Sequence, residues 1–348
     1  MSEAVRAALA SIVEGRSLSV DEARLAMGAV MDGEATAAQL AALLVALRMR
    51  GETVGELAGF ASAMRERVLR VAAPAGSIDV VGTGGDGSGT FNISTASALV
   101  VASMGVPVAK HGNRAITSRS GAADVLEALG VRIDHTAESA ATSLREAGFA
   151  FLFAPAFHPA MRHAGPTRRE IGIRTAFNLI GPLTNPAGAT RALIGVGDPA
   201  VAPRIAEVAA LLGTERTMVV HGNGVDELPL DGTGVAYDVS GGEVEVRTID
   251  PAAYGLGPAP TRALAGGTAQ ENAEILESIF AGETGPRQDV ILLNAGAALV
   301  VAGHSGDLAA GVEAAREALA AGRPRDLLAA LRAERDVALA AAPAGASA

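Results

Sequence analysis

The sequence predicts an α/β fold in which a small all-helical domain precedes a larger α/β domain with a mainly parallel central sheet. Residues 1–72 show apolar positions at helical spacing and contain no candidate strand. From residue 73 to about 340, short apolar runs alternate with helical segments, which is typical of a parallel sheet covered by helices. The chain of 348 residues is long enough for two such domains, and its end, 341–348, has too little to bury and is expected to fray.

Four short helices are expected in the first domain. Apolar residues recur at helical spacing in the segments Val5–Ile12, Ala23–Val30, Leu40–Met49 and Leu57–Val68. Ser19 with Glu22, and Thr53 with Glu56, have the spacing of capping boxes. These two pairs therefore predict where the second and fourth helices begin.

The second domain is expected to alternate strands and helices. The candidate strands are 77–81, 106–110, 131–135, 149–154, 192–197 and 217–222. The candidate helices between them are 94–104, 120–129, 137–147 and 200–212. A Pro/Gly-rich passage at 249–267 predicts a linker or surface loop, and helices resume from Thr268.

Composition excludes several classes of function. The chain has no cysteine, which rules out disulfides, thiolate catalysis and cysteine-ligated metal centres. Its net charge of −10 disfavours nucleic acid as the main partner. The N-terminus lacks a signal-peptide pattern, and no uncharged apolar stretch approaches the ~18 residues of a membrane span. We expect a cytoplasmic protein with no membrane or nucleic-acid partner.

One glycine-rich stretch carries the most information about the ligand. Residues 78–95 read IDVVGTGGDGSGTFNIST, a candidate strand followed by a glycine loop and the start of an apolar helix. Glycines let the backbone approach an anion, and the first turn of a helix offers free N–H groups. We interpret the stretch as a cradle for a phosphorylated molecule; the alternative is an ordinary turn between strand and helix. Asp86 either caps the loop or orients ribose hydroxyls or metal-bound water.

Two more specific interpretations of this loop are poor. Gly82, Gly84 and Gly87 match the dinucleotide pattern G-x-G-x-x-G, but a nicotinamide site also needs an acidic residue at the end of the next strand. Lys110 and His111 stand there instead. A P-loop is also excluded, because no Gly-Lys-Ser/Thr follows the loop.

Three further segments hold candidate site residues. Residues 110–114 read KHGNR at a predicted strand end, where open α/β sheets bind ligands, although a solvated loop is the alternative. Asp226 and Glu227 lie in another glycine loop at a strand end; they form either a surface loop or a magnesium site completed by substrate phosphates. Arg168 is either part of a solvated helix face or turned into a pocket to grip a carboxylate.

These segments together resemble the anthranilate phosphoribosyltransferase family. The resemblance rests on GTGGDGSGTFNIST, KHGNRAITSRSGAADVLEALG, HPAMRHAGPTRREIGIRTAFNLIGPLTNP and HGNGVDELP, in order and spacing, and it covers almost the whole chain. It implies a glycosyltransferase of tryptophan biosynthesis that transfers the phosphoribosyl group of 5-phosphoribosyl 1-pyrophosphate to the amine of anthranilate. It also implies a homodimer formed through the helical domain, to which part of 155–190 returns, and magnesium, with two ions expected per site.

The resemblance also assigns roles to individual residues. It implies that these bind 5-phosphoribosyl 1-pyrophosphate: Gly82, Gly85, Asp86, Thr90, Asn92, Ile93, Ser94, Thr95, Lys110, His111, Gly112, Asn113, Arg114, Ala115, Ile116, Thr117 and Ser118. Magnesium is assigned to Ser94, Asp226 and Glu227, and anthranilate to Gly82, Asn113 and Arg168 with His111 nearby. The family often has serine where this chain has Ala122, so a phosphate contact there would be absent or replaced.

The chemistry of that transfer suggests three catalytic residues. Negative charge grows on the departing pyrophosphate, so fixed cations such as Lys110 and Arg114 would stabilise the transition state. His111 would either take the released proton or orient the amine. Two rival functions remain: a pyrimidine nucleoside phosphorylase of the same architecture, and a non-catalytic relative that binds nucleic acid.

Overall fold

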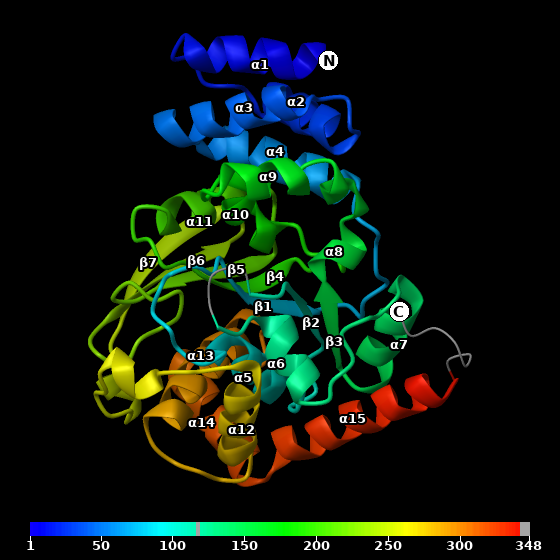
Figure 1. Ribbon diagram of the computed structural model, residues 1–348. Helices are drawn as coiled ribbons and strands as arrows, with labels where there is room; N and C mark the ends of the chain where they lie inside the picture. The colour runs from blue at the N-terminus through cyan, green and yellow to red at the C-terminus, as the bar shows by residue number, and fades with distance from the viewer. Residues whose placement is uncertain (116–118, 342–348) are drawn as a thin grey trace.

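The computed structural model describes residues 1–115 and 119–341, and it has a helical bundle stacked on an α/β part (Figure 1). The bundle contains α1 (Glu3–Val13), α2 (Val20–Met31), α3 (Ala37–Arg50) and α4 (Val54–Glu66). Both predicted capping boxes are confirmed: the hydroxyl of Ser19 accepts from Glu22 N–H, and that of Thr53 accepts from Glu56 N–H. The side-chain oxygens thus satisfy N–H groups that have no partner in a first helical turn.

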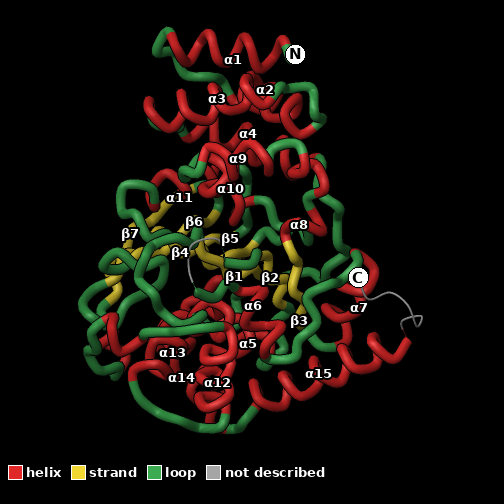
Figure 2. Tube along the Cα trace, viewed as in Figure 1, coloured by secondary structure: helices red, strands yellow, loops and turns green. Residues whose placement is uncertain are grey.

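A seven-stranded sheet forms the centre of the α/β part, in the order β3-β2-β1-β4-β5-β6-β7 (Figure 2). Its strands are β1 (Ile78–Gly82), β2 (Val108–Gly112), β3 (Phe149–Phe153), β4 (Arg191–Gly195), β5 (Arg216–His221), β6 (Gly234–Ser240) and β7 (Glu243–Ile249). The first five strands are parallel, and β6 and β7 extend the sheet as an antiparallel hairpin. All five parallel strands therefore end at one edge of the sheet.

Helices cover both faces of this sheet (Figure 1). The face away from the bundle is covered by α5 (Ile93–Ala102), α6 (Ala122–Ala128), α12 (Ala269–Phe280), α13 (Pro286–Val301), α14 (Leu308–Ala320) and α15 (Arg323–Ala341). The remaining helices are α7 (Ala137–Glu146), α8 (Ala154–Phe157), α9 (Gly165–Ile171), α10 (Ala176–Ile180) and α11 (Ala202–Leu211). Short 3₁₀ turns occupy Pro159–Arg162, Gly181–Leu183, Pro251–Tyr254 and Thr261–Leu264.

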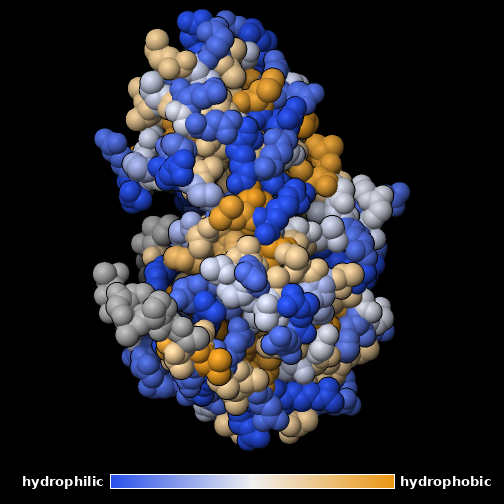
Figure 3. Space-filling model, turned by 90° about the vertical axis from the view of Figure 1, so that its right-hand side faces the viewer, coloured by the Kyte–Doolittle hydropathy of each residue, from blue (hydrophilic) through white to orange (hydrophobic). Residues whose placement is uncertain are grey.

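The bundle and the sheet share a core. One apolar cluster runs from the buried side chains of α1–α4 through α10 to β4, β5 and α11. Within it, α9 packs on α3, and α10 packs on α3 and α4, so a segment from the middle of the chain contacts the N-terminal helices. Figure 3 shows the surface notched at one side, between the narrower helical part above and the α/β part below.

Most of the predicted elements are confirmed, and one strand is wrong. The strands at 77–81, 106–110, 149–154, 192–197 and 217–222 agree with β1–β5 to within two residues. Residues 131–135 form no strand, although Val131, Ile133 and His135 alternate inward as a strand would. The hairpin of β6 and β7 was not predicted. No helix in the described ranges is long and apolar enough to cross a bilayer, and of the predicted frayed tail only Ala341 is described.

Candidate functional site

The predicted cradle is built between the end of β1 and the start of α5. Gly84, Gly85, Gly87 and Gly89 have positive φ angles between 63° and 75°, which residues with a Cβ rarely adopt. At four positions the loop backbone therefore adopts a conformation that a side chain would strain. This conformation is the physical reason that the sequence needs so many glycines here.

The loop after β5 closes on this cradle. The N–H of Gly84 donates to Asp226 Oδ2 at 2.8 Å, and the N–H of Asp226 donates to Asp86 Oδ2 at 3.2 Å. Asp86 also accepts from the N–H of Ser88 at 3.1 Å, so its loop-capping role is observed. The structure thus brings together Asp86 and Asp226, which are 140 residues apart in the sequence.

Glycines make this approach possible from both sides. A Cβ on Gly82 would lie 2.3 Å from Asp226 Oδ2, and a Cβ on Gly195 would lie 1.6 Å from the carbonyl oxygen of Asp226. Both distances are far shorter than any non-bonded contact. Gly195 ends β4, the strand between β1 and β5, and the sequence reasoning had not singled it out.

The two adjacent carboxyls carry raised pKa values. Burial is the main cause for both, and the charge of Asp86 adds to it for Asp226, whose pKa rises to about 7. The pKa of Glu227 is raised by burial and by Asp226, and it is lowered in part by Lys110 and by a hydrogen bond from the backbone N–H of Ser94. A cation would relieve this unbalanced negative charge.

These carboxylates fit magnesium in particular. Among the described residues there is no cluster of three or more His, Cys, Asp or Glu side chains arranged to hold a metal ion. Magnesium commonly takes one or two carboxylates and completes its shell with water and substrate phosphates. Ser94, the third predicted ligand, lies beside Glu227, to which its N–H donates.

Lys110 lies beneath the cradle rather than within it. Its side chain is buried, and Nζ donates to the carbonyl oxygen of Val80 at 2.5 Å and lies 3.5 Å from Ser94 Oγ. Burial lowers the pKa of Lys110, while Asp79, Glu227 and Asp226 oppose that shift. The ammonium group is therefore positioned to balance the carboxylates from below.

His111 is buried and neutral. Burial is the main cause that lowers its pKa to about 3, and the neighbouring His158 adds to the shift; the centroids of the two rings are 5.1 Å apart. Its N–H on the main chain donates to Asp79 Oδ1 at 3.1 Å, and its Nε2 atom has no partner within the described ranges. A ring with such a low pKa is a poor proton acceptor at neutral pH but a good hydrogen-bonding group.

Arg114 forms ion pairs with two carboxylates of α6. Its Nη1 atom lies 2.9 Å from Asp124 and 2.8 Å from Glu127, and these partners raise its pKa. Asp124 also accepts from the N–H groups of Ala115 and Gly121, which ties the two ends of the loop together.

The other predicted residues of this segment lie around it. Gly112 ends β2, Asn113 is exposed after it, and Ala122 begins α6. The predicted residues Ile116, Thr117 and Ser118 lie outside the described residues.

Arg168 lies on α9 and faces the aromatic ring of Phe177 on α10. Its guanidinium lies 4.8 Å from the centroid of the Phe177 ring, and burial lowers its pKa. In the described part of the chain it has no carboxylate partner. Arg174 was not predicted; its guanidinium donates to the carbonyl oxygens of Thr83 and Gly84, so it holds the first turn of the cradle.

The remaining predicted residues lie at or next to the start of α5, the helix that follows the cradle. Asn92 is the N-cap of α5, and Ile93 and Thr95 are buried behind it. Thr90 pairs with Ala265 in an isolated antiparallel bridge. The amide group of Asn92 hydrogen-bonds to Ser120 and Asn272 rather than to its own helix.

Comparisons with known proteins identify the family. Residues 75–325 match the α/β-domain model of the glycosyl transferase family, and residues 6–68 match its helical bundle domain. The chain is 54% identical over 319 residues to the anthranilate phosphoribosyltransferase of Thermomicrobium roseum, covering 89% of this chain and 91% of the relative. It is 51% identical to that of Rhodopseudomonas palustris, covering 88% and 91%. The chain belongs to the anthranilate phosphoribosyltransferase family.

Solved structures of anthranilate phosphoribosyltransferases share the whole fold. The enzyme of Thermus thermophilus superposes with a TM-score of 0.90 at 45% identity, covering 96% of this chain and 100% of that one. The enzyme of Saccharomyces cerevisiae, solved in complex with PRPP and Mg, has a TM-score of 0.88 at 27% identity, covering 97% and 99%. The fold and the glycosyltransferase class predicted from the sequence are confirmed.

Two buried asparagines support the candidate site from behind, and sequence reasoning missed both. Asn294 of α13 accepts from the N–H of Leu228 at 2.9 Å and donates to its carbonyl oxygen at 3.0 Å, which fixes the residue next to Glu227. Asn272 of α12 donates to Asn92 Oδ1 at 2.8 Å. For Asn294 the available signal was one amide inside the apolar run of α13, since a buried amide needs hydrogen-bond partners. Asn272 lies in an amphipathic helix that also carries a glutamine, so no comparable signal marked it.

Proposed function

We propose that this protein transfers the phosphoribosyl group of 5-phosphoribosyl 1-pyrophosphate to the amine of anthranilate, giving N-(5-phosphoribosyl)anthranilate and pyrophosphate. The observation that carries the proposal is the closure of the Asp226–Glu227 loop on the glycine cradle, through the hydrogen bond from Gly84 N–H to Asp226 Oδ2. With that closure, the glycine loop would bind an anion through its backbone beside a carboxylate pair, in a chain of this family. A sugar that carries a phosphate at one position and a pyrophosphate at another suits both the anion-binding loop and a metal held by the carboxylates.

Magnesium fits this site, with two ions per site proposed. Asp226 and Glu227 would hold it, with Ser94 beside them, because burial and the neighbouring carboxylates raise the pKa of both carboxyls and a bound cation would relieve that cost. Bound there with the substrate, the metal would neutralise charge on the leaving pyrophosphate. The charge of Lys110 favours the ionised form of Glu227 from below, and we propose Lys110 as a positioning residue rather than a direct ligand of pyrophosphate.

Anthranilate binding is proposed on the opposite side of the cradle. Arg168 has no carboxylate partner among the described residues and is held against Phe177, so it is available for the carboxylate of anthranilate. Gly82 and Asn113 would lie along the ring of the substrate. The pKa of His111, lowered to about 3, favours a role in orienting the amine over that of a base. An aromatic amine is already neutral and needs no prior deprotonation.

The domain division and the homodimer also belong to this proposal. We propose a helical domain of residues 1–72 joined by part of 155–190, and an α/β domain of 73–340. Support comes from the packing of α9 and α10 on α3 and α4. Val13, Leu25 and Met49 of the helical domain are 73%, 58% and 83% exposed, which favours a second copy at this end. Analytical ultracentrifugation would show a dimer, and a monomer at micromolar concentration would contradict it.

A direct assay tests the proposed reaction. The protein is mixed with anthranilate, 5-phosphoribosyl 1-pyrophosphate and magnesium, and the fluorescence of anthranilate is followed. We expect loss of fluorescence that requires all three components. Phosphorolysis of thymidine or uridine with no loss of anthranilate would instead favour the nucleoside phosphorylase, and salt-dependent binding of DNA at nanomolar affinity would favour the nucleic-acid-binding relative.

A further inference from the structure

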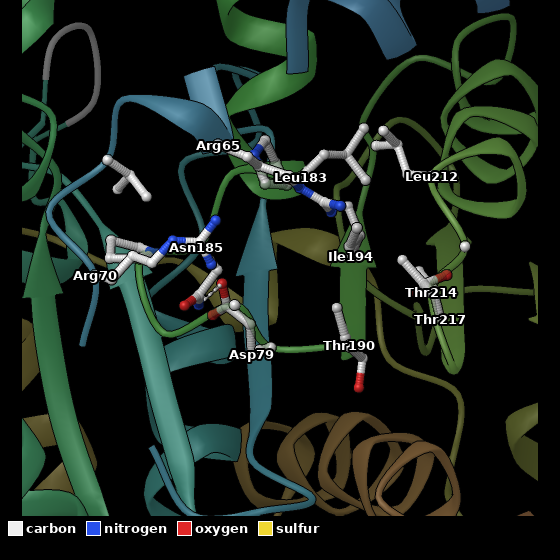
Figure 4. Close-up of a pocket in the computed structure, with 17 residues that line it drawn as sticks. Arg65, Arg70, Asp79, Leu183, Asn185, Thr190, Ile194, Leu212, Thr214 and Thr217 are labelled. Carbon is white, nitrogen blue, oxygen red and sulfur yellow. Dashed lines mark hydrogen bonds between the residues drawn. The ribbon is translucent and has the colours of Figure 1, made fainter. Parts of the chain in front are cut away.

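A cavity separate from the cradle lies on the face of the sheet that packs against the helical bundle. It is found between the central strands and the end of α4 (Figure 4). Its volume is about 230 Å³, and no residue that lines it belongs to the cradle at 82–95 or to the Asp226–Glu227 loop. Asp79 of β1 and Thr217 of β5 point into it, whereas their neighbours Val80 and Met218 pack in the core of the opposite face. The cavity is therefore separate from the proposed catalytic site.

Two arginines line this cavity; Arg65 is half-buried and Arg70 is exposed. Arg65 of α4 donates from Nε to the carbonyl oxygen of Leu183 at 2.6 Å, and Arg70 follows in the segment after α4. Burial and the charge of Arg70 lower the pKa of Arg65. Within residues 1–115 and 119–341 neither arginine forms an ion pair. Two cations directed into one cavity favour an anion between them.

A buried hydroxyl points to the same conclusion. Thr217 is 0% exposed, lines the cavity, and its Oγ1 atom has no hydrogen-bond partner in the described part of the chain. Leaving a buried hydroxyl unpaired is costly, so such groups in native proteins usually have a hydrogen-bond partner. In Figure 4, Thr214 and Thr217 lie across the cavity from Arg70, while Arg65 lies above Ile194. A ligand between them would contact cations on one side and a hydroxyl on the other.

We propose that this cavity binds a small oxyanion, a phosphate or carboxylate group held by Arg65 and Arg70 with Thr217 as a hydrogen-bond donor. The volume suits a single ion with a few waters or a small organic acid, since a water occupies about 30 Å³ of liquid. Asp79 also lines the cavity, on the same side as Arg70 in Figure 4, so its carboxylate offsets part of the positive charge there.

Occupation of the cavity is linked to the proposed site through Asp79. Its Oδ1 atom accepts from the N–H of His111, and its Oδ2 atom accepts from Asn185, which also lines the cavity. A bound anion would oppose the ionised form of Asp79, because like charges raise the pKa of a carboxyl. Asp79 therefore connects the wall of the cavity to the main chain of His111.

Crystals soaked in selenate test the proposal, because anomalous scattering locates selenium directly. We expect a selenium peak between Arg65 and Arg70 in the unmodified protein and in the surface control R316Q/R325Q, but none in R65Q/R70Q. A cavity peak that persists in R65Q/R70Q would be an adventitious ion only, and no cavity peak in the unmodified protein would overturn the proposal. A peak at residues 82–95 reports on the catalytic site and is scored separately.

A second variant guards against loss of folding in R65Q/R70Q. Thr217→Val preserves the shape of the side chain and removes only the hydroxyl. Titration calorimetry with selenate should show about tenfold weaker binding to the cavity in Thr217→Val, the effect of losing one hydrogen bond to a charged group. Competition with phosphate or acetate then identifies the preferred oxyanion. Unchanged affinity in Thr217→Val, or displacement by neither competitor, would contradict the assignment.

Discussion

Replacement of Asn294 by leucine tests whether the loop that carries Glu227 is held from behind. Leucine has a similar size but leaves the buried N–H and carbonyl groups of Leu228 without partners, whereas the carbonyl of Val290 remains within its helix. Each of these two unpaired buried groups costs about 1–3 kcal/mol, so we expect a loss of about 2–6 kcal/mol in the free energy of unfolding. Urea denaturation measures this loss.

The same variant should also bind magnesium more weakly. If Asn294 positions the loop, the magnesium concentration for half-maximal activity should rise at least fivefold, and the stabilisation of the protein by magnesium should shrink accordingly. Ser143→Ala is the matched control: it removes a buried hydroxyl that contacts Phe149 O and the Glu334 carboxylate, each at 2.7 Å, far from this loop. A destabilised Asn294→Leu protein with unchanged magnesium response would show that Asn294 is only structural.

Four further predictions concern the cradle and its partners. The free energy of unfolding of the magnesium-free protein should fall as the pH rises from about 4 through about 7. The reason is that native Asp226, with a pKa raised to about 7, retains a proton that the unfolded chain has lost. Urea titrations at several pH values measure this fall, and Asp226→Asn should flatten the profile. Asp226→Asn with Glu227→Gln should lower kcat more than tenfold and weaken magnesium dependence, and unchanged kinetics would remove both from the metal site. Arg168→Ala should raise the KM for anthranilate at a cost of about 1.5–3 kcal/mol in kcat/KM, whereas unaltered kinetics would make Arg168 a surface residue. Gly82→Ala should abolish activity because its Cβ would lie 2.3 Å from Asp226 Oδ2, while Gly306→Ala, in open space, should have no effect.

Local patterns in the sequence predicted the elements, but not every pairing between them. Residues 131–135 have the alternation of a strand, and Val131 and Ile133 do pack in the core. Among the described residues no strand pairs with residues 131–135, and such pairing depends on distant parts of the chain. The β6–β7 hairpin was missed because β7 is an exposed edge strand with few buried residues. Gly241 and Gly242, both with positive φ, were the available signal for its two-residue turn.

The candidate site was predictable where one segment carries the chemistry and not where distant segments meet. The cradle follows from its own glycines, and the strand ends brought Asp226 and Glu227 to the same edge as expected. The burial of Lys110 and the ion pairs of Arg114 could not be predicted, because Val80, Asp124 and Glu127 decide them through tertiary contacts. A cation beside an anion site in sequence thus need not point into that site.

The most direct test of the central claim is a crystal structure of this protein with 5-phosphoribosyl 1-pyrophosphate and magnesium. We expect the pyrophosphate between the backbone of residues 82–95 and the carboxylates of Asp226 and Glu227, with the metal bridging the carboxylates and the phosphate oxygens. Pyrophosphate bound away from this loop, or metal bound without either carboxylate, would contradict the account.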